Sequence, residues 1–307
     1  MEFTMGETCN TSENREKNSM RERLDLFEEK KRQIEEKEKF LQKTFPLKIL
    51  KKLPNMEGIT KRTARFLRFK SLVYLLRHDH PKIFLRHFLK HPFRYALGLG
   101  RSYLSRGKRE GDFFLCNTPS VDAFANKLVN KDHLFVLGFS YCHKPFECPS
   151  GRFNDRCDFE EDHPVCGQCF IGKCRALAKN ARLLLIPTVH YIGEKMMEMV
   201  HEHPKKKVLF LITACEMSLR MFHDWGVMLG IEGLGVRLDG RICNTMRAFV
   251  LSEQGIKPGL TVVLPETQEK ILELLKIRGA YGKVLDAHSH QKGAPSPKSK
   301  KSCKALF

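Results

Sequence analysis

Residues 132–142 read DHLFVLGFSYC, and residues 207–215 read KVLFLITAC. Each is a short, nearly continuous apolar run that ends in a cysteine, a pattern typical of a strand buried on both faces of a parallel sheet. Strands and helices alternate around these two runs, with further strands expected at 182–188 and 233–238 and helices at 194–203 and 216–225. Such alternation favours an α/β fold with a mostly parallel sheet covered by helices.

The cysteines that end these runs are candidates for a functional site. In parallel sheets, sites gather beyond the carboxyl ends of the strands, so Cys142 and Cys215 are expected at one edge. Cys243 comes soon after the strand that ends near Leu238, in a turn containing Asp239 and Gly240. We therefore expect Cys243 to join the other two.

The loop after residue 142 is dense in thiols, and a helix is expected to begin near Ile171. Cys166-Gly-Gln-Cys169 has the spacing that lets two thiolates bind one tetrahedral centre. Residues 1–19 lack the apolar stretch required for export, which predicts a reducing cytoplasm and favours metal binding or redox chemistry over structural disulfides. The candidate metal ligands are Cys142, Cys148, Cys157, Cys166, Cys169, Cys174, Cys215 and Cys243.

Thiolates in this number fit an iron–sulfur cluster, for which we expect the four-iron form, with zinc as the alternative. Zinc prefers closed sites with four ligands, whereas a cluster also tolerates an incomplete ligand set. The cysteine spacing matches neither the two-cluster ferredoxin pattern nor the motif of radical enzymes that use S-adenosylmethionine. Two complete four-thiolate sites require Cys174 as a ligand.

The net charge of +19 is concentrated in two flanking segments. Segment 61–109 carries fourteen Lys or Arg and one acid, Asp79, whereas 288–307 carries five Lys and no acid. The cysteine-rich middle is close to neutral. A polyanionic partner is therefore expected to meet the flanks and not the thiols.

Composition divides the chain into five segments. We expect disorder in 1–19, a charged helix in 20–58, a basic amphipathic helical region in 59–109, the cysteine-rich α/β domain in 110–287 and a disordered basic tail in 288–307. Within 20–42, Met20, Phe27, Ile34 and Leu41 recur every seven residues. This thin apolar seam fits either weak self-association or packing of the helix on its own domain.

Segment 59–109 alternates basic residues with large apolar ones, and Pro81 and Pro92 mark helix starts or breaks. This pattern suits a helix lying on an anionic membrane surface, although ordinary packing and, less favoured, nucleic-acid binding also fit. No apolar run has the length required to span a bilayer. We expect a cytoplasmic protein that is peripheral at the membrane.

The order of the cysteines and their neighbours resembles a known family. The relevant residues are Tyr141-Cys142, Cys148-Pro149, Cys157, Cys166-Gly167-Gln168-Cys169 with Ile171-Gly172, Ala214-Cys215 and Cys243-Asn244-Thr245. This succession is similar to the prokaryotic domain of unknown function 116, marked by seven cysteines and suspected of binding metal. The resemblance covers about residues 130–255 and implies that these seven cysteines form the site, with Cys174 an extra. The resemblance does not imply any particular reaction.

Three functions fit these patterns. The leading hypothesis is an iron–sulfur protein that transfers electrons to an unidentified redox partner or acts on a small substrate. The second is a zinc-stabilised interaction module recruited to a membrane surface or another polyanion. The third is a metal-free thiol redox enzyme that uses Cys166 or Cys169 near a helix start. No nucleotide-binding glycine loop or hydrolytic constellation is visible in the sequence.

Overall fold

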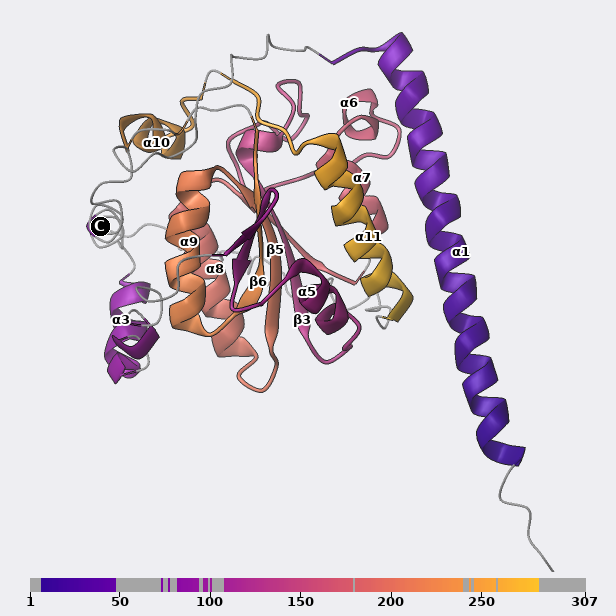
Figure 1. Ribbon diagram of the computed structural model, residues 1–307. Helices are drawn as coiled ribbons and strands as arrows, with labels where there is room; N and C mark the ends of the chain where they lie inside the picture. Colours follow the sequence, from indigo (N-terminus) through magenta and orange to yellow (C-terminus); the bar gives the residue numbers. More distant parts are fainter. Residues whose placement is uncertain are drawn as a thin grey trace, which may run out of the picture.

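A computed structural model describes residues 7–47, 73, 77, 82–93, 96–98, 100, 108–178, 180–239, 243, 246–257 and 259–281. Its strands are β1 (Arg109–Glu110), β2 (Phe113–Cys116), β3 (Leu134–Ser140), β4 (Arg182–Ile186), β5 (Val208–Ala214) and β6 (Glu232–Arg237). They form one sheet in the order β1-β2-β6-β5-β3-β4 (Figure 1). Strands β3 to β6 are parallel, and β1 and β2 run antiparallel at one edge. The α/β class and the mostly parallel sheet are confirmed.

Strand β3 lies in the middle of the parallel part, where Gly138 pairs with Leu184 of β4 and with Ile212 of β5. All seven residues of β5 are buried. Burial on both faces disfavours polar side chains, which is why these strands are recognisable as nearly continuous apolar runs, with Thr213 and Ser140 as buried exceptions.

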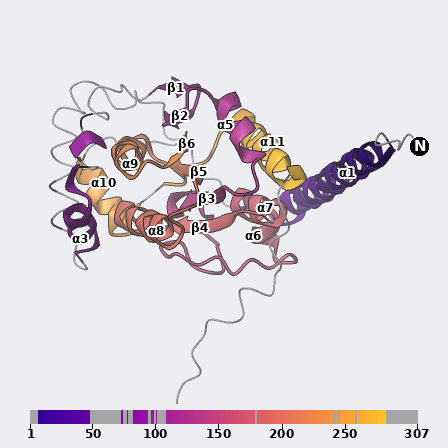
Figure 2. The same cartoon turned by 90° about the horizontal axis from the view of Figure 1, so that it is seen from below.

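The helices are α1 (Glu7–Thr44), α3 (Ile83–Lys90), α5 (Val121–Leu128), α6 (Pro164–Gly167), α7 (Phe170–Leu177), α8 (Val189–Glu202), α9 (Glu216–Leu229), α10 (Met246–Glu253) and α11 (Pro265–Tyr281). Helices α8 and α9 cover one face of the sheet, and α5, α7 and α11 cover the other (Figure 2). Helix α8 begins earlier than expected because Thr188 Oγ1 accepts a hydrogen bond of 3.1 Å from the Tyr191 N–H and caps it. A layer of apolar side chains fills each side of the sheet.

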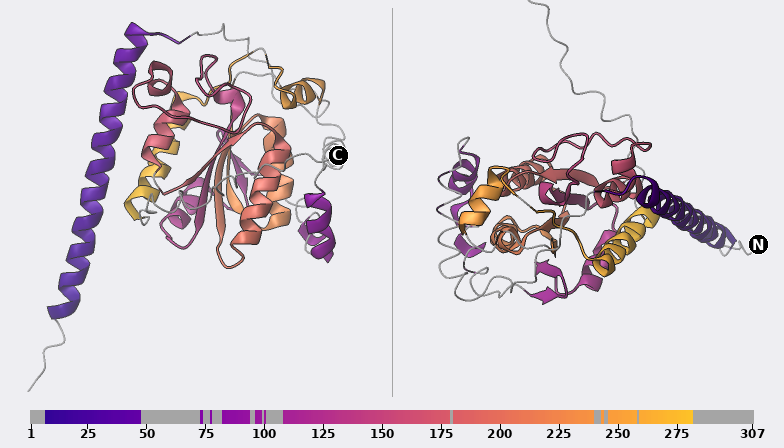
Figure 3. Two further views of the ribbon diagram at one scale, coloured as in Figure 1. Left: turned by 180° about the vertical axis from the view of Figure 1, so that it is seen from behind. Right: turned by 90° about the horizontal axis from the view of Figure 1, so that it is seen from above.

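Helix α1 lies along the outside of α11 and α7 (Figure 3). Leu41 is buried, and Phe27 and Ile34 pack against the core on that side, so the seam contacts the chain's own domain. Lys31 Nζ lies 2.7 Å from Glu269 Oε2 of α11. The helix starts at Glu7, inside the segment 1–19 expected to be disordered, and it ends at Thr44, well before residue 58.

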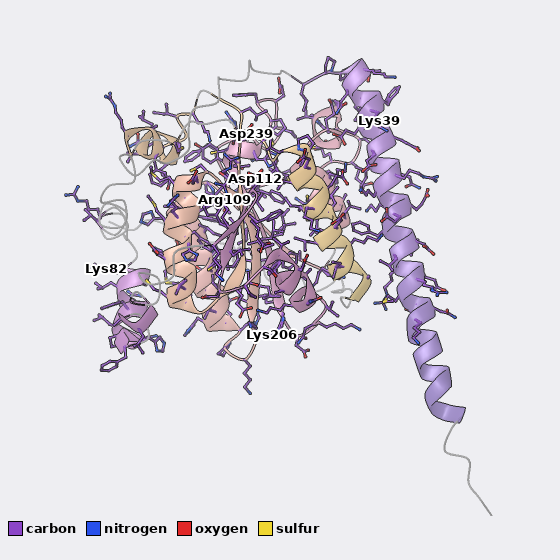
Figure 4. All side chains as sticks on the ribbon, in the orientation of Figure 1. Lys39, Lys82, Arg109, Asp112, Lys206 and Asp239 are labelled. Atoms are coloured by element: carbon purple, nitrogen blue, oxygen red, sulfur yellow. The ribbon has the colours of Figure 1, made fainter. Side chains whose placement is uncertain are left out.

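Most of segment 59–109 and all of 288–307 lie outside the described residues. Within 59–109, the described helix α3 lies on the side of the molecule opposite α1, as Lys82 at its start and Lys39 on α1 show in Figure 4. None of the helices in the described ranges combines the length and apolar character needed to cross a bilayer.

Candidate functional site

The cysteines gather at the carboxyl end of the parallel strands. In Figure 4, Asp239, just after β6, marks this end, and Lys206, just before β5, marks the opposite one. The chain leaves β3 toward α7 on one face of the sheet, but it leaves β5 toward α9 on the other face. Open α/β sheets bind ligands at such a switch point between neighbouring strands.

Four cysteines line one cavity of about 20 Å³, here called the four-cysteine cavity. They are Cys148, Cys157, Cys166 and Cys169, and all of them come from the loop between β3 and α7. Leu185 of β4 and Gly172 of α7 close the cavity on the side of the sheet. The volume is that of about one water-sized sphere.

Local hydrogen bonds and one glycine shape this loop. His163 caps α6, because its Nδ1 accepts a hydrogen bond of 3.2 Å from the Val165 N–H. A Cβ atom at Gly172 would lie 2.6 Å from Cys166 O, so only glycine lets α7 approach the Cys166–Cys169 turn this closely. The loop therefore presents Cys166 and Cys169 from a compact turn.

Burial dominates the electrostatics of these thiols. It raises the pKa of Cys169 to about 12, although the N–H groups of Gly172 and Ile171 act in the opposite direction. Burial likewise raises the pKa of Cys166, and Cys157 and Cys148 contribute in the same direction. Without a bound cation, these two side chains are thiols and not thiolates.

Lys144 places a buried ammonium group beside the four-cysteine cavity. Its side chain is 1% exposed, and Nζ donates hydrogen bonds to Asn154 Oδ1 at 2.8 Å and Arg156 O at 2.9 Å. Burial lowers the pKa of Lys144, whereas the charges of Cys148 and Cys157 favour its protonated form. A fixed cation at this position compensates negative charge on the sulfur atoms.

Arg152 connects the start of the cysteine loop to the segment after α10. Its guanidinium donates to Lys144 O at 3.2 Å, Cys142 O at 3.3 Å and Gly259 O at 2.7 Å. The same group lies 4.1 Å from the centre of the Phe146 ring. This one side chain fixes the backbone beside both sets of cysteines.

The remaining edge cysteines, Cys142, Cys215 and Cys243, form what we call the three-cysteine group. Cys142 and Cys215 line a second cavity, of about 30 Å³, at the ends of β3 and β5. The Cys243 thiol donates a hydrogen bond of 3.3 Å to Ser252 Oγ, and Ser252 lines the same cavity as Cys215, whose sulfur lies 3.1 Å from Ser218 Oγ. Cys243 does not itself line this cavity, and its membership of the site stays a prediction.

Charges in the three-cysteine group favour one thiolate. The neighbouring Cys243 side chain, with help from the Lys257 ammonium, lowers the pKa of Cys215 to about 6 against the effect of burial. The interaction with Cys215, together with burial, raises the pKa of Cys243. Burial alone would lower the pKa of Lys257, but the charges of the thiols, Cys142 first among them, raise it. Both shifts favour negative charge on Cys215 and a proton on Cys243.

Cys174 lies in neither group. It is fully buried in the core formed with α5 and α11, and it lines neither of the two cavities. Burial raises the pKa of its thiol well above the ordinary value. Within the described ranges, no three His, Cys, Asp or Glu side chains are already arranged closely enough to hold a metal ion.

Sequence reasoning missed three basic residues of the site, namely Lys144, Arg152 and Lys257. Each is partly or fully buried and faces sulfur or carbonyl oxygen atoms. In the sequence they are ordinary members of polar segments. The only available signal is that Lys144 directly follows the strand-end cysteine segment Tyr141–His143.

No family model, curated protein or solved structure matches this chain. The resemblance to the domain of unknown function 116 therefore depends on the order and local context of the cysteines alone.

Proposed function

We propose that this protein binds an iron–sulfur cluster through the thiolates of the four-cysteine cavity and transfers electrons. The observation that carries the proposal is the convergence of Cys148, Cys157, Cys166 and Cys169 on one cavity beside a buried ammonium group. Four soft sulfur donors form the ligand set that iron–sulfur clusters and zinc take up, and hard cations such as Mg²⁺ and Ca²⁺ avoid it. A bound cluster would supply one-electron oxidation and reduction.

The surrounding residues have two roles in this proposal. Lys144 Nζ compensates the negative charge of four thiolates, and Asn154 Oδ1 holds this ammonium group in place at 2.8 Å. The N–H groups of Ile171 and Gly172 at the start of α7 point at Cys169 and stabilise its thiolate. Hydrogen bonds of this kind to the ligand sulfur set the reduction potential of a cluster.

Metal and sulfide analysis of anaerobically purified protein tests this function. We expect a coloured protein that contains iron and acid-labile sulfide in comparable amounts. Stoichiometric zinc with neither iron nor sulfide would overturn electron transfer and leave a structural metal site, because zinc has no redox chemistry. A protein without metal would overturn the site as well.

Cys169, the N-cap of α7, and Cys174, within α7, provide a matched comparison. Cys169→Ser removes a proposed ligand, whereas Cys174→Ser alters a neighbouring thiol that lies in the core. We expect iron and sulfide to be lost from the first variant and retained in the second. Equal loss in both, with the fold intact by circular dichroism, would contradict the ligand assignment.

We further propose that α3 brings the protein to an anionic membrane surface. Its described side chains include exposed apolar groups, namely Leu85, Phe88 and Leu89, and the adjacent Phe93 and Leu97 are 83% and 66% exposed. Lys82, Arg86 and Lys90 are exposed on the same short segment. Each basic residue near an anionic surface contributes about 1 kcal/mol, and the apolar groups add insertion.

Vesicle flotation measures this binding. We expect the full chain to float with vesicles that contain phosphatidylserine and much less with phosphatidylcholine alone. Replacing Leu89 and Phe93 by Ser should reduce flotation, whereas Phe40→Ser, on the exposed surface of α1, should not. Equal flotation with both kinds of vesicle, or binding to RNA but not to vesicles, would contradict the proposal.

A further inference from the structure

The three-cysteine group occupies the switch point between β3 and β5, where an open α/β sheet is most suited to bind a substrate. Cys243 and Cys215 come together there, although they are 28 positions apart in the sequence, because Cys215 packs against the core that contains Cys243, and Ser252, the hydrogen-bond partner of Cys243, lines the same cavity as Cys215. Cys142 and Cys243 are 5% and 4% exposed, whereas Cys215 is only partly buried. Cys215 is thus the least buried residue of the three.

Lys257 supplies an independent sign that this place is built for negative charge. Its side chain is 7% exposed, and its ammonium group makes no hydrogen bond of ordinary geometry within the described ranges. The groups it faces are the thiols of Cys142, Cys243 and Cys215. A buried ammonium group needs a compensating charge, so negative charge on these thiols stabilises the arrangement.

The position of Lys257 is fixed by the backbone. Arg152 donates to Lys257 O at 3.4 Å and to Gly259 O at 2.7 Å, and Thr261 Oγ1 donates to Cys142 O at 3.0 Å. These bonds join the segment after α10 to the end of β3. The ammonium group is therefore held against the thiols by the fold itself.

We propose that Cys215 and Cys243 form a reversible dithiol–disulfide couple that reduces a low-molecular-weight disulfide. The Cys215 thiolate attacks one sulfur of the substrate, the S–S bond of the substrate breaks, and one thiolate leaves and takes up a proton from water. Cys243 then loses its proton to water and attacks Cys215 Sγ, which releases the second thiolate. Two thiols are oxidised by two electrons, and one disulfide becomes two thiols.

The surroundings of the two sulfur atoms suit these roles. Cys215 is the N-cap of α9, a helix of fourteen residues, and its sulfur lies 3.1 Å from Ser218 Oγ. Both features stabilise a thiolate, in line with its lowered pKa. Cys243 Sγ lies 3.3 Å from Ser252 Oγ and keeps its proton until the second step.

The test uses the reduced, full-length protein and bis(2-hydroxyethyl) disulfide as the probe. After blocking of free thiols, peptide mapping by mass spectrometry should find a disulfide between Cys215 and Cys243 that dithiothreitol reverses. In Cys243→Ser, the hydroxyethylthio group should remain on Cys215 as a mixed disulfide. Cys215→Ser should give neither product.

A second experiment tests whether the Lys257 ammonium group stabilises the Cys215 thiolate. Lys257→Gln should slow the formation of the mixed disulfide at pH 7 by about tenfold and shift its pH profile upward, because less of Cys215 is thiolate. Lys257→Arg should restore part of the rate. An unchanged rate and profile in Lys257→Gln would remove Lys257 from the mechanism.

Two results would overturn the couple itself. One is a disulfide that joins Cys215 to Cys142 in place of Cys243. The other is loss of a bound metal from Cys215→Ser and Cys243→Ser together, with no disulfide formed after the metal is removed. The inference does not depend on the cluster, so the Cys148→Ser variant should lose iron and still form the Cys215–Cys243 disulfide.

Discussion

The four-cysteine cavity and the three-cysteine group differ in how the chain brings their thiols together. The first draws on a single loop between Cys148 and Cys169, folded by a short helix and a glycine contact. The second joins residues that follow different strands and meet only because the strands are parallel. A local loop is suited to enclosing a metal, whereas a strand-end site lies where substrates enter.

The two regions also differ in the partners of their buried lysines. Lys144 has oxygen partners at 2.8 and 2.9 Å, so its charge is held whether or not the thiols ionise. Lys257 faces thiols and makes no ordinary hydrogen bond to a described residue. The first lysine supports a permanent site, and the second supports a thiolate that forms during a reaction.

The largest expected effect comes from ligand substitution. Cys166→Ser should lose most of its iron and sulfide during purification, because it removes one of the four thiolates that line the cavity. Cys215→Ser should leave both contents unchanged. Elemental analysis of anaerobically purified variants measures this contrast, and equal losses in the two variants would merge the two regions into one site.

Separate substitutions of Lys144 and Lys257 test whether the two regions are independent. Lys144→Met should weaken metal retention about 10- to 100-fold in competition with a chelator, the range found when groups around metal ligands are removed. Lys257→Gln should leave metal retention as in the wild type. If Lys257→Gln also releases the metal, the assignment of the two lysines to separate functions is wrong.

Helix α1 packs on the loop that forms the four-cysteine cavity, so a substitution there should lower the stability of the protein. Leu41 Cδ1 lies 2.5 Å from the position of a Cβ atom at Gly167, so this side chain packs directly on the cysteine loop. Leu41→Ala should lower the free energy of unfolding by about 2 kcal/mol through the cavity that it leaves. Chemical denaturation measures the loss, and Leu26→Ala, at an exposed position of the same helix, is the control.

The smallest expected effect is a shift in a pH profile. Iodoacetamide reacts with thiolates, so alkylation of Cys215 should rise with pH and reach half its maximum near pH 6. Cys243→Ala removes the interaction that lowers the pKa of Cys215, so the midpoint should move upward by about one pH unit. Below the midpoint, Cys215 should then react about tenfold more slowly. A midpoint near pH 8.5 in the wild type would contradict the thiolate assignment.

Much of the fold could be predicted because buried parallel strands leave a strong signal. Strands β3 and β5 are nearly continuous apolar runs that are each followed by a cysteine, and their parallel direction places Cys142 and Cys215 at one edge. Strand β2 was missed because four residues, Phe113–Cys116, are too few to show a period. The start of α8 was missed because Thr188 looked like the end of a strand when it is a helix cap.

The site was predictable only in part. Thiol spacing predicted a set of candidate cysteines, but their division into four, three and the buried Cys174 depends on distances that the sequence does not contain. The roles of Lys144 and Lys257 depend on burial, and buried lysines have no distinctive sequence pattern. Long-range contacts, such as those of Arg152 with Gly259, arise only after the sheet has formed.

Differential alkylation with mass spectrometry tests the central claim, that the two regions are separate. In metal-loaded, reduced protein, we expect Cys148, Cys157, Cys166 and Cys169 to be protected and Cys215 to react first among the edge cysteines. Removal of the metal should expose the four without changing the rate at Cys215. This account would be contradicted if the metal also protected Cys215 and Cys243 and its removal exposed all six cysteines together.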